Sequence, residues 1–103
     1  MYKVYIWGCG KRYNRLSSYL NVYKNQIEVL GIISGVEEKF SYMDGLPIIK
    51  PDDIELTNVD FIIVASTYWN EILNLIKQKN IDENYLIRAE VFENPWFDLE
   101  AYI

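Results

Sequence analysis

A turn with two glycines, placed between the first apolar run and the first amphipathic segment, constrains the fold most strongly. Residues 3–7 (KVYIW) are rich in β-branched and aromatic side chains, as in a strand, and the turn GCG at residues 8–10 stops that run. Between residues 12 and 25 the larger apolar side chains recur with the spacing of one helix face: Leu16, Tyr19, Leu20 and Tyr23. The sequence therefore predicts a strand, a tight turn and a helix in direct succession.

The same alternation continues along the chain. Residues 27–33 and 60–65 are almost entirely apolar, which is typical of strands covered on both faces of a parallel sheet. A second long helix is predicted to begin at Ser66-Thr67, and residues 85–87 are predicted as a fourth strand. We expect the polar stretch 36–49, with an Asp-Gly turn, to run over the surface, and residues 51–54 to form a brief helix.

Strands that alternate with helices predict an α/β fold with right-handed crossovers. We expect a Rossmann-like three-layer sandwich with a short parallel sheet of about four strands, in the order 3-2-1-4 or a shorter relative. The length fits one domain, residues 1–103, which either stands alone or is a piece of a larger protein. The aromatic and acidic tail from residue 92 either wraps this domain or meets a neighbour.

Charge and cysteine content exclude several classes of function. The net charge of −5 argues against a nucleic-acid partner, although residues 1–26 are basic without a single acid and residues 82–103 are mainly acidic. Cys9 is the only cysteine and histidine is absent, so we expect no disulfide, no metal site and a cytoplasmic location. No apolar run approaches the roughly twenty residues of a membrane span.

The glycine turn has the chemistry of a phosphate cradle. Gly8 and Gly10 match the start of the G-x-G-x-x-G fingerprint, in which the backbone approaches a pyrophosphate at a helix N-terminus. Lys11 and Arg12 add positive charge there, and Cys9 is either a small turn residue or a thiol with a lowered pKa. The sequence therefore predicts a small phosphate-containing ligand, although a turn that binds nothing remains an alternative.

Two departures from the fingerprint argue against NAD in its usual pose. Tyr13 stands where the third glycine is expected, and its side chain must either push the helix outward or point away from the turn. The strand 27–33 is followed by Ser34 instead of the acid that binds a ribose, and Glu37 and Glu38 come slightly late. We therefore expect NAD to bind weakly.

A second group of candidates follows the apolar strand 60–65. Ser66, Thr67 and Tyr68 lie where open α/β sheets bind ligands, at the carboxyl end of the strand, although helix capping explains Ser66 or Thr67 equally well. We expect Tyr13 and Tyr68 to be the aromatic residues near a ligand and assign Trp7 and Trp69 to packing. The acidic pairs at 37–38 and 52–53 are expected to be solvated turns, and no residue is assigned as catalytic.

The order of these motifs resembles a known group of domains. WGCGK at residues 7–11, VLGII at 29–33, DGLPI at 44–48, PDDI at 51–54 and DFIIVAS at 60–66 together look like the Rossmann-like N-terminal domains of bacterial polysaccharide-biosynthesis proteins. Those proteins include sugar acyltransferases and nucleotide-sugar dehydratases, and the resemblance covers residues 2–88. It implies a nucleotide or nucleotide-sugar site at Gly8, Gly10, Ser66 and Thr67, with chemistry supplied by a second domain or partner.

Three functions compete on this evidence. The first is a binding module for a nucleotide or nucleotide-sugar in surface-polysaccharide biosynthesis. The second is a degenerate Rossmann scaffold that mediates assembly with a second domain or as a homo-oligomer. The third is a fragment of a small NAD-dependent sugar-nucleotide oxidoreductase, against which the lack of histidine and of a Tyr-x-x-x-Lys pair argues.

Overall fold

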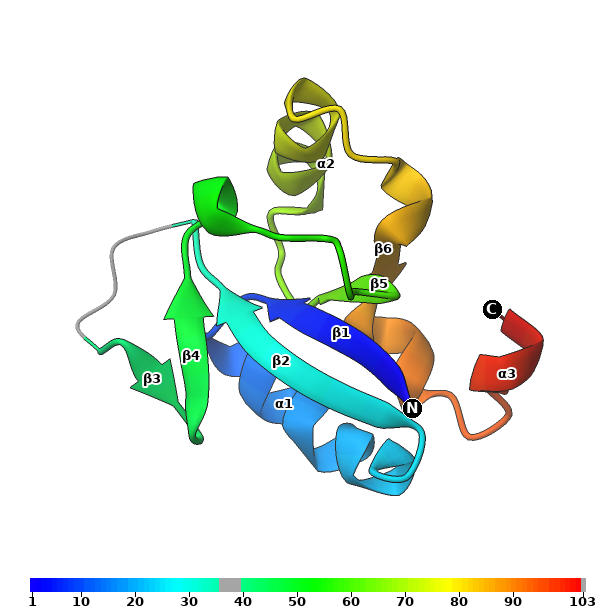
Figure 1. Cartoon of the computed structure of the whole chain (residues 1–103). Helices are drawn as coiled ribbons and strands as arrows, with labels where there is room; N and C mark the ends of the chain where they lie inside the picture. Colours follow the sequence, from blue (N-terminus) through cyan, green and yellow to red (C-terminus); the bar gives the residue numbers. More distant parts are fainter. Residues whose placement is uncertain (36–39, 103) are drawn as a thin grey trace.

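The computed structural model describes residues 1–35 and 40–102 and contains one six-stranded sheet in the order β3-β4-β2-β1-β5-β6 (Figure 1). β3 and β4 pair antiparallel, and every other neighbouring pair is parallel. The strands span Tyr2–Trp7 (β1), Ile27–Ile33 (β2), Tyr42–Met43 (β3), Leu46–Ile49 (β4), Phe61–Val64 (β5) and Leu86–Arg88 (β6). The predicted α/β class with a largely parallel sheet is confirmed.

The sequence led us to expect that the polar stretch 36–49 runs over the surface. Residues 36–39 lie outside the described residues, but residues 40–49 contribute two strands to the sheet. Asp44 and Gly45 have φ angles of 53° and 76°, which build a tight hairpin turn between β3 and β4. β4 then pairs with β2, Ile32 opposite Ile48, so that position is already filled when the chain reaches β5. β5, the third strand predicted from the sequence, pairs with β1 instead of β2, so the expected order 3-2-1-4 was wrong. The hairpin adds β3 and β4 to the four expected strands.

Helices cover both faces of the sheet, as a three-layer sandwich requires. Side chains alternate along β1, so Val4 and Ile6 pack on the face covered by α1 (Lys11–Leu20), while Tyr5 and Trp7 pack on the face covered by α2 (Trp69–Gln78). Short 3-10 helices lie at Asn21–Tyr23, Pro51–Asp53, Glu83–Tyr85 and Ala89–Glu93. Within residues 1–35 and 40–102, no helix has the length and apolar character needed to cross a bilayer.

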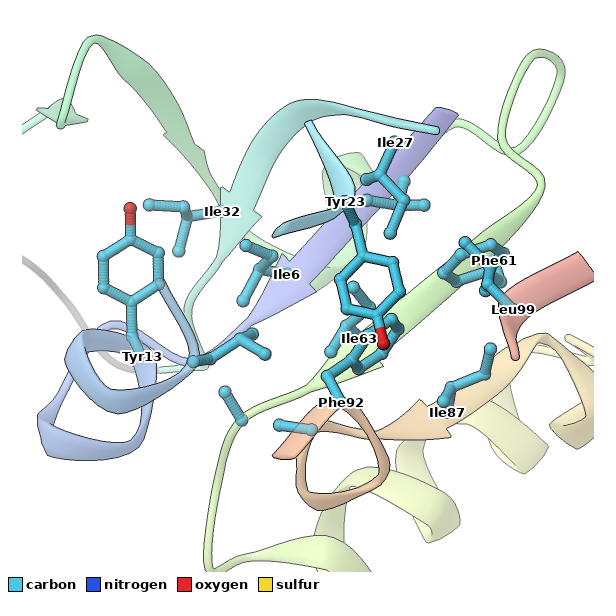
Figure 2. Close-up of a cluster of buried hydrophobic side chains, with 14 residues drawn as sticks. Ile6, Tyr13, Tyr23, Ile27, Ile32, Phe61, Ile63, Ile87, Phe92 and Leu99 are labelled. Atoms are coloured by element: carbon cyan, nitrogen blue, oxygen red, sulfur yellow. The ribbon is translucent and has the colours of Figure 1, made fainter. Parts of the chain in front are cut away.

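The C-terminal segment wraps the domain on the α1 face. It consists of the 3-10 helix Ala89–Glu93 and α3 (Leu99–Tyr102). Phe92 is 3% exposed, and its ring meets that of Tyr23 edge-on with the centroids 5.3 Å apart. Figure 2 shows these two side chains next to each other in the core. Arg12 and Arg15 of α1 form ion pairs with Glu90 and Glu93. Of the two readings of the tail, the structure therefore favours the one in which it completes the core.

The start of α2 differs from the prediction. The helix begins at Trp69, and Tyr68 occupies the N-cap without a side-chain capping bond. The Ser66 hydroxyl instead accepts a hydrogen bond from the Tyr68 N–H at 3.1 Å, which turns the chain between β5 and α2. Neither Ser66 nor Thr67 therefore caps the helix, and both lie in the turn that follows β5.

Candidate functional site

An open cleft of about 790 Å³ lies at the carboxyl ends of β1, β2 and β5. The chain leaves β1 toward β2 on one side, and β5 lies on the other, so this is the point where ligands of open α/β sheets bind. Apart from Tyr13, the residues that the sequence singled out for binding line this cleft: Gly8, Cys9, Gly10, Lys11, Arg12, Ser34, Ser66, Thr67 and Tyr68. The fold thus brings three separate segments together.

The two glycines of the turn have different reasons to be glycine. Gly8 has a φ of 121°, and a Cβ there would lie 2.2 Å from the carbonyl oxygen of Ala65, so the packing of β1 against the end of β5 requires it. Gly10 has a φ of −96°, and a Cβ there would meet nothing within 4 Å. No atom of the described protein therefore stands in the way of a side chain at position 10, where the backbone borders open space.

Gly10 is also the N-cap of α1. It has no side chain that could accept bonds from the first-turn N–H groups, and its carbonyl accepts from the Asn14 N–H at 3.2 Å. The first N–H groups of an α-helix have no partner within the helix, and the helix dipole makes this end positive. An anion in the cleft would therefore meet backbone donors without displacing a capping side chain.

The two basic side chains after the turn are not equivalent. Arg12 forms an ion pair with Glu90 of the C-terminal segment, which offsets part of the positive charge that the sequence suggested for the cradle. Lys11 lines the cleft and forms no ion pair with any residue in the described ranges. Lys11 is therefore the principal cation available to a bound anion.

Tyr13 does not border the cleft, so its expected place near a ligand was wrong. Its side chain is 3% exposed and packs in the core on the α1 face, beside Ile32 (Figure 2). Its hydroxyl donates a hydrogen bond to Oδ2 of Asp44 at 2.8 Å. The large residue at the third fingerprint position thus points toward the β3–β4 hairpin and leaves the turn open.

The opposite wall comes from α2. Tyr68, Glu71, Ile72 and Leu75 line the cleft at the spacing i, i+3, i+4 and i+7, so one face of the helix contributes them. Of these four residues, only Tyr68 was predicted from the sequence to lie near a ligand, although the i, i+3, i+4, i+7 spacing that includes the other three is visible in the sequence. Trp7, assigned to packing, is 3% exposed and also reaches the cleft from the end of β1.

The other acidic residues considered from sequence lie elsewhere or outside the described ranges. Asp52 is exposed and pairs with Lys79, which holds the pKa of its carboxyl below the usual range. Glu37 and Glu38 lie outside the described residues. In the part of the chain that is described, no three His, Cys, Asp or Glu side chains gather in a way that could hold a metal ion.

Comparison with known proteins identifies one family. Residues 1–87 match the family model described as C2185-like, N-terminal. No curated protein matches the chain.

Proposed function

This chain belongs to the family described as C2185-like, N-terminal, and we propose that its cleft binds the phosphates of a nucleotide or nucleotide-sugar. The phosphates lie against the first turn of α1, where Gly10 leaves space and Lys11 supplies charge. The observation that carries this proposal is the open side of Gly10. No atom of the described chain excludes a side chain at this position, whereas the close approach of a phosphate does.

The dimensions of the cleft support a ligand larger than inorganic phosphate. About 790 Å³ lies within the range of pockets that hold cofactors and drug-sized molecules. The apolar side chains Trp7, Ile72 and Leu75 supply burial, and Ser34, Ser66 and Thr67 supply hydroxyls. Ser34 replaces the acid that NAD requires at the end of β2, so we expect NAD to bind more weakly than a nucleotide-sugar.

Among the described residues that line the cleft we assign no catalytic pair, and the role that we propose is binding. Within the same residues, no ion pair joins any two of Lys11, Arg12 and Glu71. We place the domain in the cytoplasm, in surface-polysaccharide biosynthesis, and assign the chemistry to a second domain or partner. The location follows from the single cysteine, and the pathway and the second domain follow from the resemblance of the motifs at residues 2–88.

Calorimetric titration of the whole chain with UDP-glucose, UDP, coenzyme A and NAD tests the proposal. We expect UDP-glucose and UDP to bind more tightly than NAD. Gly10→Val fills the space beside the α1 amides and should weaken UDP binding by about tenfold or more, because charge-assisted hydrogen bonds to the phosphate are lost. The free energy of unfolding should change by less than about 1 kcal/mol, since the new side chain points into open space.

A matched pair of lysine variants separates the cleft from general charge effects. Lys11→Gln should weaken UDP binding about threefold to tenfold, whereas Lys24→Gln, beyond the other end of α1, should leave it unchanged. If the parent binds none of these ligands and Gly10→Val folds equally well, the domain is a scaffold and the proposal is wrong.

A further inference from the structure

The two walls of the cleft carry opposite charges. Lys11 extends the positive end of α1 on one side, and Glu71 lies in the first turn of α2 on the other. Neither forms an ion pair with any residue that the structure describes, whereas Arg12 is paired with Glu90. A ligand that spans the cleft therefore meets Lys11 and the positive end of α1 on one side and the carboxylate of Glu71 on the other.

The groups that can recognise sugar hydroxyls are concentrated on the β5–α2 side. Ser66, Thr67 and Glu71 lie there, whereas Ser34 is the single hydroxyl-bearing or acidic lining residue on the β2 side within the described ranges. Hydroxyl groups of a sugar donate to carboxylates and exchange hydrogen bonds with serine and threonine. With the phosphates against α1, this distribution places the sugar against α2.

We propose that Glu71 makes the cleft selective for nucleotide-sugars whose sugar is neutral and rich in hydroxyl groups, and against those whose sugar carries a carboxylate. This inference rests on the proposed binding of a nucleotide-sugar. A carboxylate on the sugar cannot donate a hydrogen bond to Glu71, and it adds like-charge repulsion. Glu71 is exposed, so solvent and salt screen this repulsion, which is strongest at low ionic strength.

A comparison of UDP-glucose with UDP-glucuronate tests this selectivity, because the two ligands differ at a single sugar carbon. We expect the parent chain to bind UDP-glucose about threefold to tenfold more tightly than UDP-glucuronate at low salt, and less so at high salt. Glu71→Gln should bring the two affinities together, mainly by improving UDP-glucuronate. UDP itself should bind the parent and the variant alike, because Glu71 acts on the sugar.

Glu28→Gln is the matched control, since Glu28 lies exposed near the start of β2, whereas the cleft lies at the other end of the strands. It should retain the selectivity of the parent. Equal affinity for both sugars in the parent, or a ratio that Glu71→Gln leaves unchanged, would overturn the role of Glu71 while UDP binding upholds the proposed function. If neither UDP nor UDP-glucose binds, the proposed function and this inference fail together.

Discussion

Tyr13 decides how the incomplete glycine fingerprint is accommodated. The position normally favours glycine so that helix and strand can pack closely, yet here a tyrosine fills it. Its ring enters the core beside Ile32, and its hydroxyl bonds to Asp44 in the hairpin turn. Tyr13, which departs from the glycine fingerprint, therefore connects α1 to the β3–β4 hairpin at the edge of the sheet.

Removal of the Tyr13 hydroxyl should change stability in a pH-dependent way. Burial, with the hydrogen bond to Asp44, raises the pKa of Tyr13 from 10.0 to about 12. The folded state thus holds this proton more tightly than the unfolded state. Its contribution is complete below about pH 10 and is lost as the pH rises toward the folded-state value. Tyr13→Phe should cost about 1 kcal/mol near neutral pH and show a shallower loss of stability in alkali.

Urea unfolding at a series of pH values measures this effect. Tyr42→Phe is a suitable control, because Tyr42 lies 67% exposed on β3 and should reproduce the alkaline profile of the parent. Superimposable alkaline profiles for Tyr13→Phe and the parent would show that the buried hydroxyl is not responsible.

At the scale of elements, apolar periodicity predicted the central strands and both long helices. These segments bury one face or both, so the order of apolar and polar residues within each segment is enough to identify it. The hairpin was missed as part of the sheet because β3 and β4 have only two and four residues, and β4 is only partly buried throughout. The Asp44-Gly45 turn itself was predicted, but which strand β4 would pair with depends on distant contacts.

The sequence predicted the glycine turn and the segment after β5 as parts of the candidate site, but not the lining residues within α2. Strand ends and glycines are local signals, so the turn at Gly8 and the segment after β5 were identified from sequence. Glu71 was not predicted to line the cleft, because an acid close to the start of a helix has an ordinary explanation in the helix dipole. That Glu71 lies opposite Lys11 across a cleft follows only from the tertiary structure.

The C-terminal segment provides a test of element packing with two neighbouring aromatic residues. Phe92 is 3% exposed and lies edge-on to Tyr23 and Phe97, whereas Trp96 is 89% exposed. Phe92→Ala should destabilise the protein by about 3–5 kcal/mol, through lost burial and a cavity. Trp96→Ala should change the free energy of unfolding by less than about 0.5 kcal/mol. Similar urea midpoints for the two variants would contradict the packing described here.

At the scale of the whole molecule, the basic N-terminal part of the sequence contacts the acidic C-terminal part. The basic first helix faces the acidic C-terminal segment through the pairs Arg12–Glu90 and Arg15–Glu93. Both pairs lie at the surface, so each contributes little on its own. The apolar contacts of Ala89, Phe92 and Leu99 beneath them, each at most 7% exposed, hold the segment in place.

Truncation after Ile87, where the family match ends, should therefore abolish cooperative folding. It removes three buried side chains from one core, and their combined loss is comparable to the marginal stability of a small domain. Near-ultraviolet circular dichroism and urea unfolding should show a loosely packed chain, and a peptide of residues 88–103 added in excess should restore the native signal. A truncated chain with a native spectrum and a sharp transition would refute this.

Arg12 belongs to two contacts at once, because it borders the cleft and also pairs with Glu90. An anion that recruited this guanidinium would draw it from Glu90 and loosen one attachment of the C-terminal segment. By thermodynamic reciprocity, a modification or partner that displaced Glu90 would in turn strengthen the hold on that anion. Binding of an anion at the N-terminal end of α1 and attachment of the C-terminal segment to α1 are thus thermodynamically linked.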